Sequence, residues 1–258
     1  MSIDLIYTPA FMEQGLLEDL TDAAKKLPFY KDLSPAHMRL STWTDGRHYA
    51  LPFNAEGSVL VYNKGLFKLA GLDAENPPKT WDEIAEAARA IDALGDDIDG
   101  FYFSGACAGC NAFTFMPYVW ADGGVLLDDK TQQPTLTGNA SLKGALEFYK
   151  AMWADGLVPA SAENDNGANF IGGFTTGKVG MIGNGAFAIG ILKNDHPEID
   201  FGLTYLPGSN GGRSSFAGGD NIGIPKGAKN KSGGMDFITW ALSDETQLEH
   251  LAASGQLP

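Results

Sequence analysis

Two groups of residues in this sequence have types and spacings that could support chemistry, and the first is a pair of cysteines. Cys107 and Cys110 form a C-x-x-C pattern, which serves thiol–disulfide exchange, supplies half of a zinc site or closes a local disulfide. A zinc site usually needs four ligands, and the sequence has neither a second C-x-x-C nor a spaced histidine pair. The pattern therefore favours a local disulfide or two unreactive thiols over a metal or redox site.

The second group is a glycine pattern. Residues Gly183–Ala188 read G-x-G-x-x-A after an apolar stretch, which is the outline of a dinucleotide site. In such a site an acidic residue ends the next strand and binds the ribose, whereas here Asp200 begins the next apolar stretch and Leu206-Pro207 ends it. The fingerprint is weak, so a dinucleotide-dependent enzyme is kept as an alternative, and we predict no cofactor.

Other enzyme classes have still less support. A glycosidase needs two facing carboxylates, and among 32 acidic residues no pattern singles out a pair. Neither a nucleophile elbow nor a metal-binding helix is present in the sequence. A carbohydrate-processing enzyme therefore also stays an alternative, and we predict no catalytic residue and no metal.

The amino-acid composition limits the classes of molecule that this chain can bind. The chain has 18 Lys and Arg against 32 Asp and Glu, a formal net charge of −14. A field of that sign repels phosphate backbones, which argues against nucleic-acid binding. Hydrophobic residues at 44% are ordinary for a globular protein. The first residues lack the basic flank and apolar stretch of a signal peptide, so we expect any targeting segment to be absent from this chain.

The elements that must position these residues alternate between strand and helix patterns, which favours an α/β fold. Apolar, β-rich stretches predict strands over Ile3–Tyr7, Ser58–Tyr62, Val179–Ile182, Ile199–Leu206 and Ile222–Pro225. The glycine-rich stretch 208–219 is expected to be a loop.

Helix signals are clearest at two places. Thr80 can cap a helix with Glu83 completing a capping box, and the expected inner face is Ile84, Ala88, Ile91 and Leu94, ending at Gly95. Asn139 can cap a second helix, whose expected inner residues are Leu142, Leu146, Tyr149, Met152 and Trp153. Later helices are expected at Met235–Leu242 and after Ser243.

Several motifs occur in a specific order along the chain. They are Tyr49–Phe53, Val61–Lys64, Leu66-Phe67, Ala70–Leu72, Pro78–Glu83, Trp120–Gly124, Phe174–Met181, Gly218–Asn221 and Gly255–Pro258. This order resembles the extracellular solute-binding proteins of family 1, the maltose-binding and glycerol-phosphate-binding relatives, over nearly the whole chain.

The resemblance implies a fold and a domain organisation. Members have two α/β lobes, the type II periplasmic-binding-protein fold, joined by crossing strands with the ligand in the cleft between them. The expected first lobe comprises residues 1–55 and 222–258, and the second comprises 56–221. Members normally begin with an extra strand–helix–strand portion and continue past the motif at 255–258, so we expect the first lobe to be incomplete.

The resemblance also implies a function. The expected protein is the substrate-binding receptor of an ABC importer, which binds a sugar or related polyol and delivers it to a membrane permease. A neutral carbohydrate is preferred because the chain is acidic, although a phosphate could still meet a local basic group. The expected location is periplasmic or extracellular, with or without a membrane anchor in the precursor. In such a secreted-type family, Cys107 and Cys110 are expected to form a disulfide or stay inert.

Sugars need hydrogen-bonding groups for their hydroxyls and aromatic faces for their C–H surfaces. The resemblance assigns ligand binding to residues at the two crossings and on cleft-facing segments: Tyr7, Asn54, Glu56, Asn111, Phe113, Asn184, Gly185, Phe187, Gly218, Gly219, Asp220 and Asn221. Phe187 would be a stacking platform and Asn184 a hydrogen-bonding group, both in a loop after the strand at 179–182.

Structural alternatives stay open for these residues. Phe187 and Phe113 could pack in the core, residues 218–221 could form a simple turn, and Asn54 with Glu56 could serve a salt bridge or a hinge hydrogen bond. Tyr7 is expected to end the first strand. Most of the tryptophans are expected in the core, and the histidines show no metal spacing.

Overall fold

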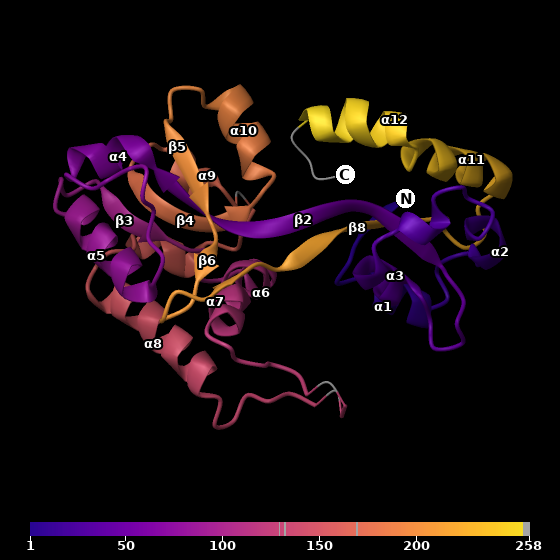
Figure 1. Cartoon of the computed structure of the whole chain (residues 1–258), viewed down its shortest axis with the longest axis horizontal. Coiled ribbons are helices and arrows are strands. Elements are labelled where there is room, and N and C mark those ends of the chain that lie inside the picture. The colour runs from indigo at the N-terminus through magenta and orange to yellow at the C-terminus, as the bar shows by residue number, and fades with distance from the viewer. Residues whose placement is uncertain (129, 132, 169, 255–258) are drawn as a thin grey trace. The chain divides into compact units, whose positions relative to one another are not determined.

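The structure, a computed structural model, describes residues 1–128, 130–131, 133–168 and 170–254 (Figure 1). It comprises two compact units: unit 1 is Met1–Gly57 with Ala217–Pro258, and unit 2 is Ser58–Phe216. Strand β2 (Ala50–Asn63) belongs to both, because the division falls inside it. The motif at 255–258 lies outside the described residues. The lobe limits expected from the sequence, after residues 55 and 221, remain a proposal.

Unit 1 is built around strand β8. The antiparallel neighbours of β8 are β1 and the first part of β2, so that Asn221 lies opposite both Ile3 and Pro52. Leu51, Ile222 and residues of the surrounding helices form its core. The elements are β1 (Ser2–Asp4), α1 (Thr8–Glu13), α2 (Thr21–Ala24), η1 (Tyr30–Asp32), α3 (Pro35–Ser41), β8 (Ala217–Gly223), α11 (Lys231–Ala241), α12 (Asp244–Thr246), η3 (Gln247–Leu251) and η4 (Ala252–Ser254).

The prediction of a first strand over Ile3–Tyr7 is wrong at its C-terminal end. Strand β1 stops at Asp4, and Tyr7 caps helix α1 with Pro9 in the first turn. A proline there begins a helix readily, because its fixed φ suits the helix and its missing N–H is not needed. The strand expected at Ile222–Pro225 also begins earlier, at Ala217, inside the stretch that we expected to be a loop.

Unit 2 contains a mixed sheet. The last part of β2 pairs antiparallel with β4 and with β5, and β3 joins β4 in parallel. Strands β6 and β7 form a separate pair. The elements are α4 (Lys64–Leu69), α5 (Trp81–Asp92), β3 (Asp99–Tyr102), α6 (Ala108–Thr114), α7 (Met116–Ala121), α8 (Ala140–Ala154), η2 (Ala160–Asn164), α9 (Gly172–Thr175), β4 (Val179–Gly185), α10 (Ala188–Asp195), β5 (Phe201–Thr204), β6 (Leu206–Pro207) and β7 (Arg213–Ser214).

The two strongest helix predictions are confirmed at their starts. The Thr80 hydroxyl accepts the Glu83 N–H, while the Glu83 carboxylate reaches back to the Lys79 N–H at 2.6 Å, one residue before the expected partner. The Asn139 side chain likewise accepts the Leu142 N–H at 3.0 Å. Such caps satisfy backbone donors that the first helical turn leaves unpaired.

The predicted inner faces of these two helices are only partly confirmed. Ile84, Ala88 and Ile91 are fully buried, but Leu94 lies past the end of α5 and is 38% exposed. On α8 the buried residues are Ala145, Phe148 and Met152, whereas Leu146 is 54% exposed. The reason is rotational, because residues at i+3 and i+4 share a face and the buried face is that of 145, 148 and 152. On this face the Phe148 ring centroid lies 5.7 Å from that of Trp81 on α5 and 5.6 Å from that of Tyr118 on α7.

Two expected strands differ in extent. Strand β4 continues beyond Ile182 to Gly185, because Gly183, Asn184 and Gly185 still pair with β2. The strand expected at 199–206 is divided into β5 and β6. Within the described residues, no helix combines the length and apolar character needed to cross a membrane.

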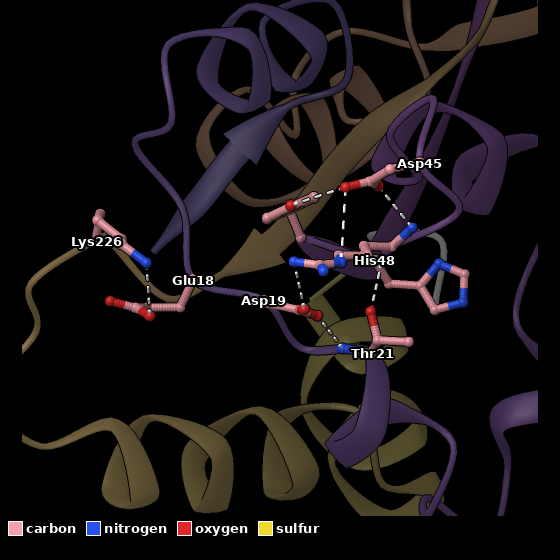
Figure 2. A network of polar contacts seen from close by, with 8 residues as sticks. Glu18, Asp19, Thr21, Asp45, His48 and Lys226 are labelled. Carbon is pink, nitrogen blue, oxygen red and sulfur yellow. Dashed lines mark hydrogen bonds and ion pairs between the residues drawn. The ribbon is translucent and has the colours of Figure 1, made fainter.

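A buried carboxylate ties two segments of unit 1 together (Figure 2). Glu18 is 8% exposed, and its Oε2 lies 2.8 Å from Lys231 Nζ and 3.4 Å from Lys226 Nζ. Its Oε1 accepts the Gly227 N–H at 2.9 Å. The Lys231 hydrogen bond, followed by the Gly227 hydrogen bond, lowers the pKa of Glu18 to about 2.

We predict that Glu18→Gln lowers the melting temperature at pH 7, because the glutamine lacks the charge that pairs with the lysines. A lowered pKa contributes stability above the ordinary value of 4.5, and that stability is lost as the pH falls towards 2. The difference between the variants should therefore shrink over this interval in calorimetric melts. Glu147→Gln is the control, since its pair with Lys143 leaves both side chains more than 60% exposed. Equal effects of the two substitutions would contradict the prediction.

Candidate ligand-binding site

Unit 2 contains a continuous row of aromatic rings. Successive ring centroids lie 6.2 Å apart for Phe187 and Phe170, 6.3 Å for Phe170 and Phe113, 5.5 Å for Phe113 and Phe216, and 6.0 Å for Phe216 and Trp120. Each of these side chains is half-buried. We call this set the aromatic row; its rings pack on one another and still reach solvent.

The aromatic row is assembled from segments far apart in the chain. Phe113 lies on α6 and Trp120 on α7, while Phe187 caps α10. Phe170 lies just before α9 and Phe216 just before β8. Two of these rings, Phe113 and Phe187, were predicted as ligand contacts. The sequence analysis did not predict Phe170, Phe216 or Trp120 as ligand contacts, although Trp120 begins one of the motifs of the family resemblance.

The predicted position of Asn184 is wrong. It lies inside β4 opposite Val59 rather than in a loop, and it is fully buried. Its Nδ2 donates to the backbone oxygen of Phe170 at 3.0 Å, and its Oδ1 accepts the Gly185 N–H at 2.9 Å. Asn184 therefore anchors the backbone that carries Phe170. Its ligand contact, and that of the buried Gly185, remain predictions.

The G-x-G-x-x-A pattern does not form a phosphate-binding loop. Its first two glycines, Gly183 and Gly185, are buried ladder residues of β4, whereas a dinucleotide site needs them in the turn after the strand. A Cβ at Gly183 would lie 3.0 Å from the Cβ of Thr114. This glycine thus serves the close packing of α6 on the sheet.

Cys107 and Cys110 form a disulfide at the start of α6, which is one of the two expected alternatives. Cys107 is the cap residue, and its sulfur accepts the Cys110 N–H at 3.1 Å. Asn111 Nδ2 donates to the Ser104 and Cys107 carbonyls at 3.2 and 3.0 Å, so it holds the same turn; its ligand contact stays a prediction. Among the described residues, no group of three or more His, Cys, Asp and Glu could hold a metal.

The predicted residues of unit 1 lie along the pairing of β2 with β8. Asn54 Oδ1 accepts the Asp220 N–H at 2.8 Å. The Gly218 carbonyl accepts from His37 Nε2 at 3.0 Å. Gly219 has φ +126°, and a Cβ there would lie 2.1 Å from the Asn54 carbonyl oxygen. Glycine is therefore required for the strands to approach, whether or not a ligand binds.

Asp220 and Asn221 lie in unusual surroundings. Asp220 faces Asp4 across the β1–β8 pairing, and burial, reinforced by the Asp4 charge, raises its pKa. Asn221 is fully buried with its Nδ2 3.4 Å from Thr8 Oγ1. Within the described residues its Oδ1 has no hydrogen-bond partner.

The remaining two predictions are placed differently. Tyr7 is 58% exposed and caps α1 instead of ending a strand. Glu56 is half-buried, and its Oε1 accepts the Gly57 N–H at 3.2 Å. The ligand roles of both stay predictions.

The prediction that most of the tryptophans lie in the core is wrong. Trp81 is buried, with its Nε1 donating to the Pro207 carbonyl at 2.8 Å. Trp153 and Trp240 are 37% and 53% exposed, and Trp120 belongs to the half-buried aromatic row. Most tryptophans are therefore not core residues.

A mixed α/β chain whose candidate residues are aromatic rings and hydrogen-bonding groups has the features of a small-molecule binding protein. Residues 1–248 match the family described as bacterial extracellular solute-binding protein. The chain belongs to this family of binding proteins.

Two of the proteins with similar sequences are named as binding proteins for small molecules. The diacetylchitobiose binding protein DasA of Streptomyces coelicolor is 29% identical over 97% of this chain and 58% of its own length. The sn-glycerol-3-phosphate-binding periplasmic protein UgpB of Brucella melitensis is 25% identical over 83% of this chain and 49% of its own.

Among solved structures, MalE3 of T. maritima with bound maltose is 26% identical with a TM-score of 0.86, covering all of this chain and 65% of MalE3. The chain thus spans less than two thirds of each of these proteins. The α/β fold of the type II periplasmic-binding-protein class is confirmed.

We predict that Asn184→Ala lowers the free energy of unfolding of the ligand-free chain by about 1–3 kcal/mol, because it leaves the Phe170 carbonyl without its buried donor. Urea denaturation measures the change. Asn210→Ala is the control, since Asn210 is exposed and its amide donates to Ser209. Unchanged stability combined with lost ligand affinity would show that Asn184 contacts the ligand instead.

Proposed function

We propose that this chain is the ligand-binding part of an ABC importer receptor that binds a sugar or related polyol on the aromatic row and delivers it to a membrane permease. The observation that carries the proposal is the row itself, which is half-buried and continuous from Phe187 to Trp120. Membership of the solute-binding family supports the receptor role.

The chemistry of the row favours a neutral carbohydrate. Ring faces contact the C–H surfaces of a sugar, and large aromatic side chains bury much area per contact. The row contains no charged side chain, and the net charge of −14 disfavours anions. A phosphorylated polyol, the kind of ligand named for UgpB, is the second candidate.

The proposal also covers catalysis and location. We propose that the chain is not an enzyme, since its family comprises binding proteins and both glycines of the glycine pattern lie within a buried strand. We propose a periplasmic or extracellular location, because disulfides such as Cys107–Cys110 persist in oxidising compartments. Membrane anchoring of the precursor and docking on a permease belong to the same proposal.

A thermal-shift screen of the full chain tests the function. The panel is maltose, maltotriose, diacetylchitobiose, mannitol and sn-glycerol 3-phosphate. A ligand that binds the folded state at 100 times its Kd stabilises it by about 2.7 kcal/mol, which is easily measured as a rise in Tm. A response to sn-glycerol 3-phosphate alone would overturn the preference for neutral sugars, and no response to any member would contradict the panel's ligand class.

We predict that Phe187→Ala and Phe113→Ala each weaken sugar affinity about tenfold, because each removes an aromatic contact from the row. Isothermal titration with the best sugar of the panel measures the effect. Phe237→Ala is the control, because Phe237 also packs on an aromatic ring, Trp240, but lies in α11 and is 54% exposed. If either row variant keeps its affinity but melts much earlier without ligand, that phenylalanine is a core residue.

A further inference from the structure

The Cys107–Cys110 disulfide lies against the backbone of Gly167. Gly167 has φ +79°, a left-handed conformation that favours glycine. A Cβ built there would lie 2.4 Å from Cys110 Sγ and 2.6 Å from Cys107 Sγ. The backbone of Gly167 therefore packs directly on the disulfide, with no room for a side chain.

Hydrogen bonds hold the two segments on either side of this contact. The Ala106 N–H donates to the Asp165 carbonyl at 2.9 Å. The Asp165 carboxylate accepts from Ser104 Oγ at 2.7 Å, Tyr102 OH at 2.8 Å and the Gly167 N–H at 2.9 Å. Burial by itself would raise the pKa of Asp165, but these hydrogen bonds keep it below the ordinary value. The carboxylate thus stays charged and holds its donors firmly.

We call the disulfide, Gly167 and Asp165 the clasp. The two chain segments that meet at the clasp each carry a ring of the aromatic row. Helix α6 begins at the disulfide and carries Phe113. On the other side, Phe170 follows Gly167, and its carbonyl is held by Asn184. The two rings lie 6.3 Å apart.

Helix α6 depends on such support. It has 7 residues, and helices that short do not hold their conformation by propensity alone. Its first turn contains Gly109, a poor helix former, and no acidic residue. The disulfide closes this turn covalently, while Thr114 packs over Gly183 at the other end.

We propose that the Cys107–Cys110 disulfide and Gly167 position Phe113 against Phe170 and thereby set the sugar affinity of the aromatic row. The positioning follows from the contacts of the clasp, whereas the effect on affinity rests on the proposed function. Neither cysteine nor Gly167 needs to touch the ligand for this role.

Two glycines provide a matched comparison. Gly138→Ala imposes a similar backbone penalty, because Gly138 has φ +75°, but its surroundings are open within 4 Å. Gly167→Ala adds a collision with the two sulfurs. A third variant, Cys107→Ala with Cys110→Ala, removes the disulfide, and a fourth combines it with Gly167→Ala. The collision with the sulfurs is the expected cause of faster exchange and weaker affinity in Gly167→Ala. If so, adding Gly167→Ala to the double alanine variant should change these two quantities no more than Gly138→Ala changes them in the unaltered chain.

Two measurements are made on the full chain in each form. Amide hydrogen exchange without ligand reports the opening of α6 and of the backbone at Phe170. Fluorescence titration with maltose, maltotriose and diacetylchitobiose reports affinity, with Trp120 in the row as a probe. We expect faster exchange in both segments for Gly167→Ala and for the double alanine variant. We expect affinity to fall about fivefold to tenfold in each, as for a displaced aromatic contact, and to change little in Gly138→Ala.

Unchanged exchange in both segments would overturn the proposal, and so would faster exchange with undiminished affinity for a sugar that the unaltered chain binds. Equal behaviour of Gly167→Ala and Gly138→Ala would also overturn it, because the sulfurs would then play no part. If the unaltered chain binds none of these sugars, the proposed effect of the disulfide on sugar affinity is wrong, and so is the preference for a neutral sugar. The exchange results, together with whether Gly167→Ala adds to the effect of the cysteine substitutions, still decide the positioning.

Discussion

Backbone pairing along β2 is the interaction on which both units depend. Its first part pairs with β8, and its last part pairs with β4 and β5. A change of register by one residue would turn every side chain to the opposite face. The register therefore decides that Asn54 receives the Asp220 N–H in unit 1 and that Asn184 is buried opposite Val59 in unit 2.

Most of the polar side chains that suggested ligand binding are occupied within the protein. Asn184 and Asn111 donate to backbone carbonyls, and Asn54 accepts a backbone N–H. Buried polar groups need such partners, since an unpaired one costs free energy. What unit 2 leaves partly open is the aromatic row, so the proposed recognition relies more on ring faces than on amides. The buried Oδ1 of Asn221 has no partner within the described part of the chain, which makes it an exception.

The glycines show how one residue type serves different ends. Gly183 and Gly219 allow neighbouring backbone or side chains to approach where a Cβ would collide with Thr114 or with the Asn54 carbonyl, and Gly167 does the same for a disulfide. None of these uses requires a nucleotide. The first glycine of the dinucleotide pattern, Gly183, thus serves close packing between α6 and β4.

The sequence by itself determined the local features and the family. The caps at Thr80 and Asn139 and the strand at Ser58–Tyr62 depend on neighbouring residues, so they could be predicted from order alone. Tyr7, Leu94 and Leu146 were misplaced because propensity does not say where an element stops or which face of a helix is buried. The aromatic row combines rings from five separate segments, and only tertiary packing brings the centroids of successive rings to distances of 5.5–6.3 Å. No sequence spacing encodes these distances, since they depend on how α6, α7 and the sheet pack.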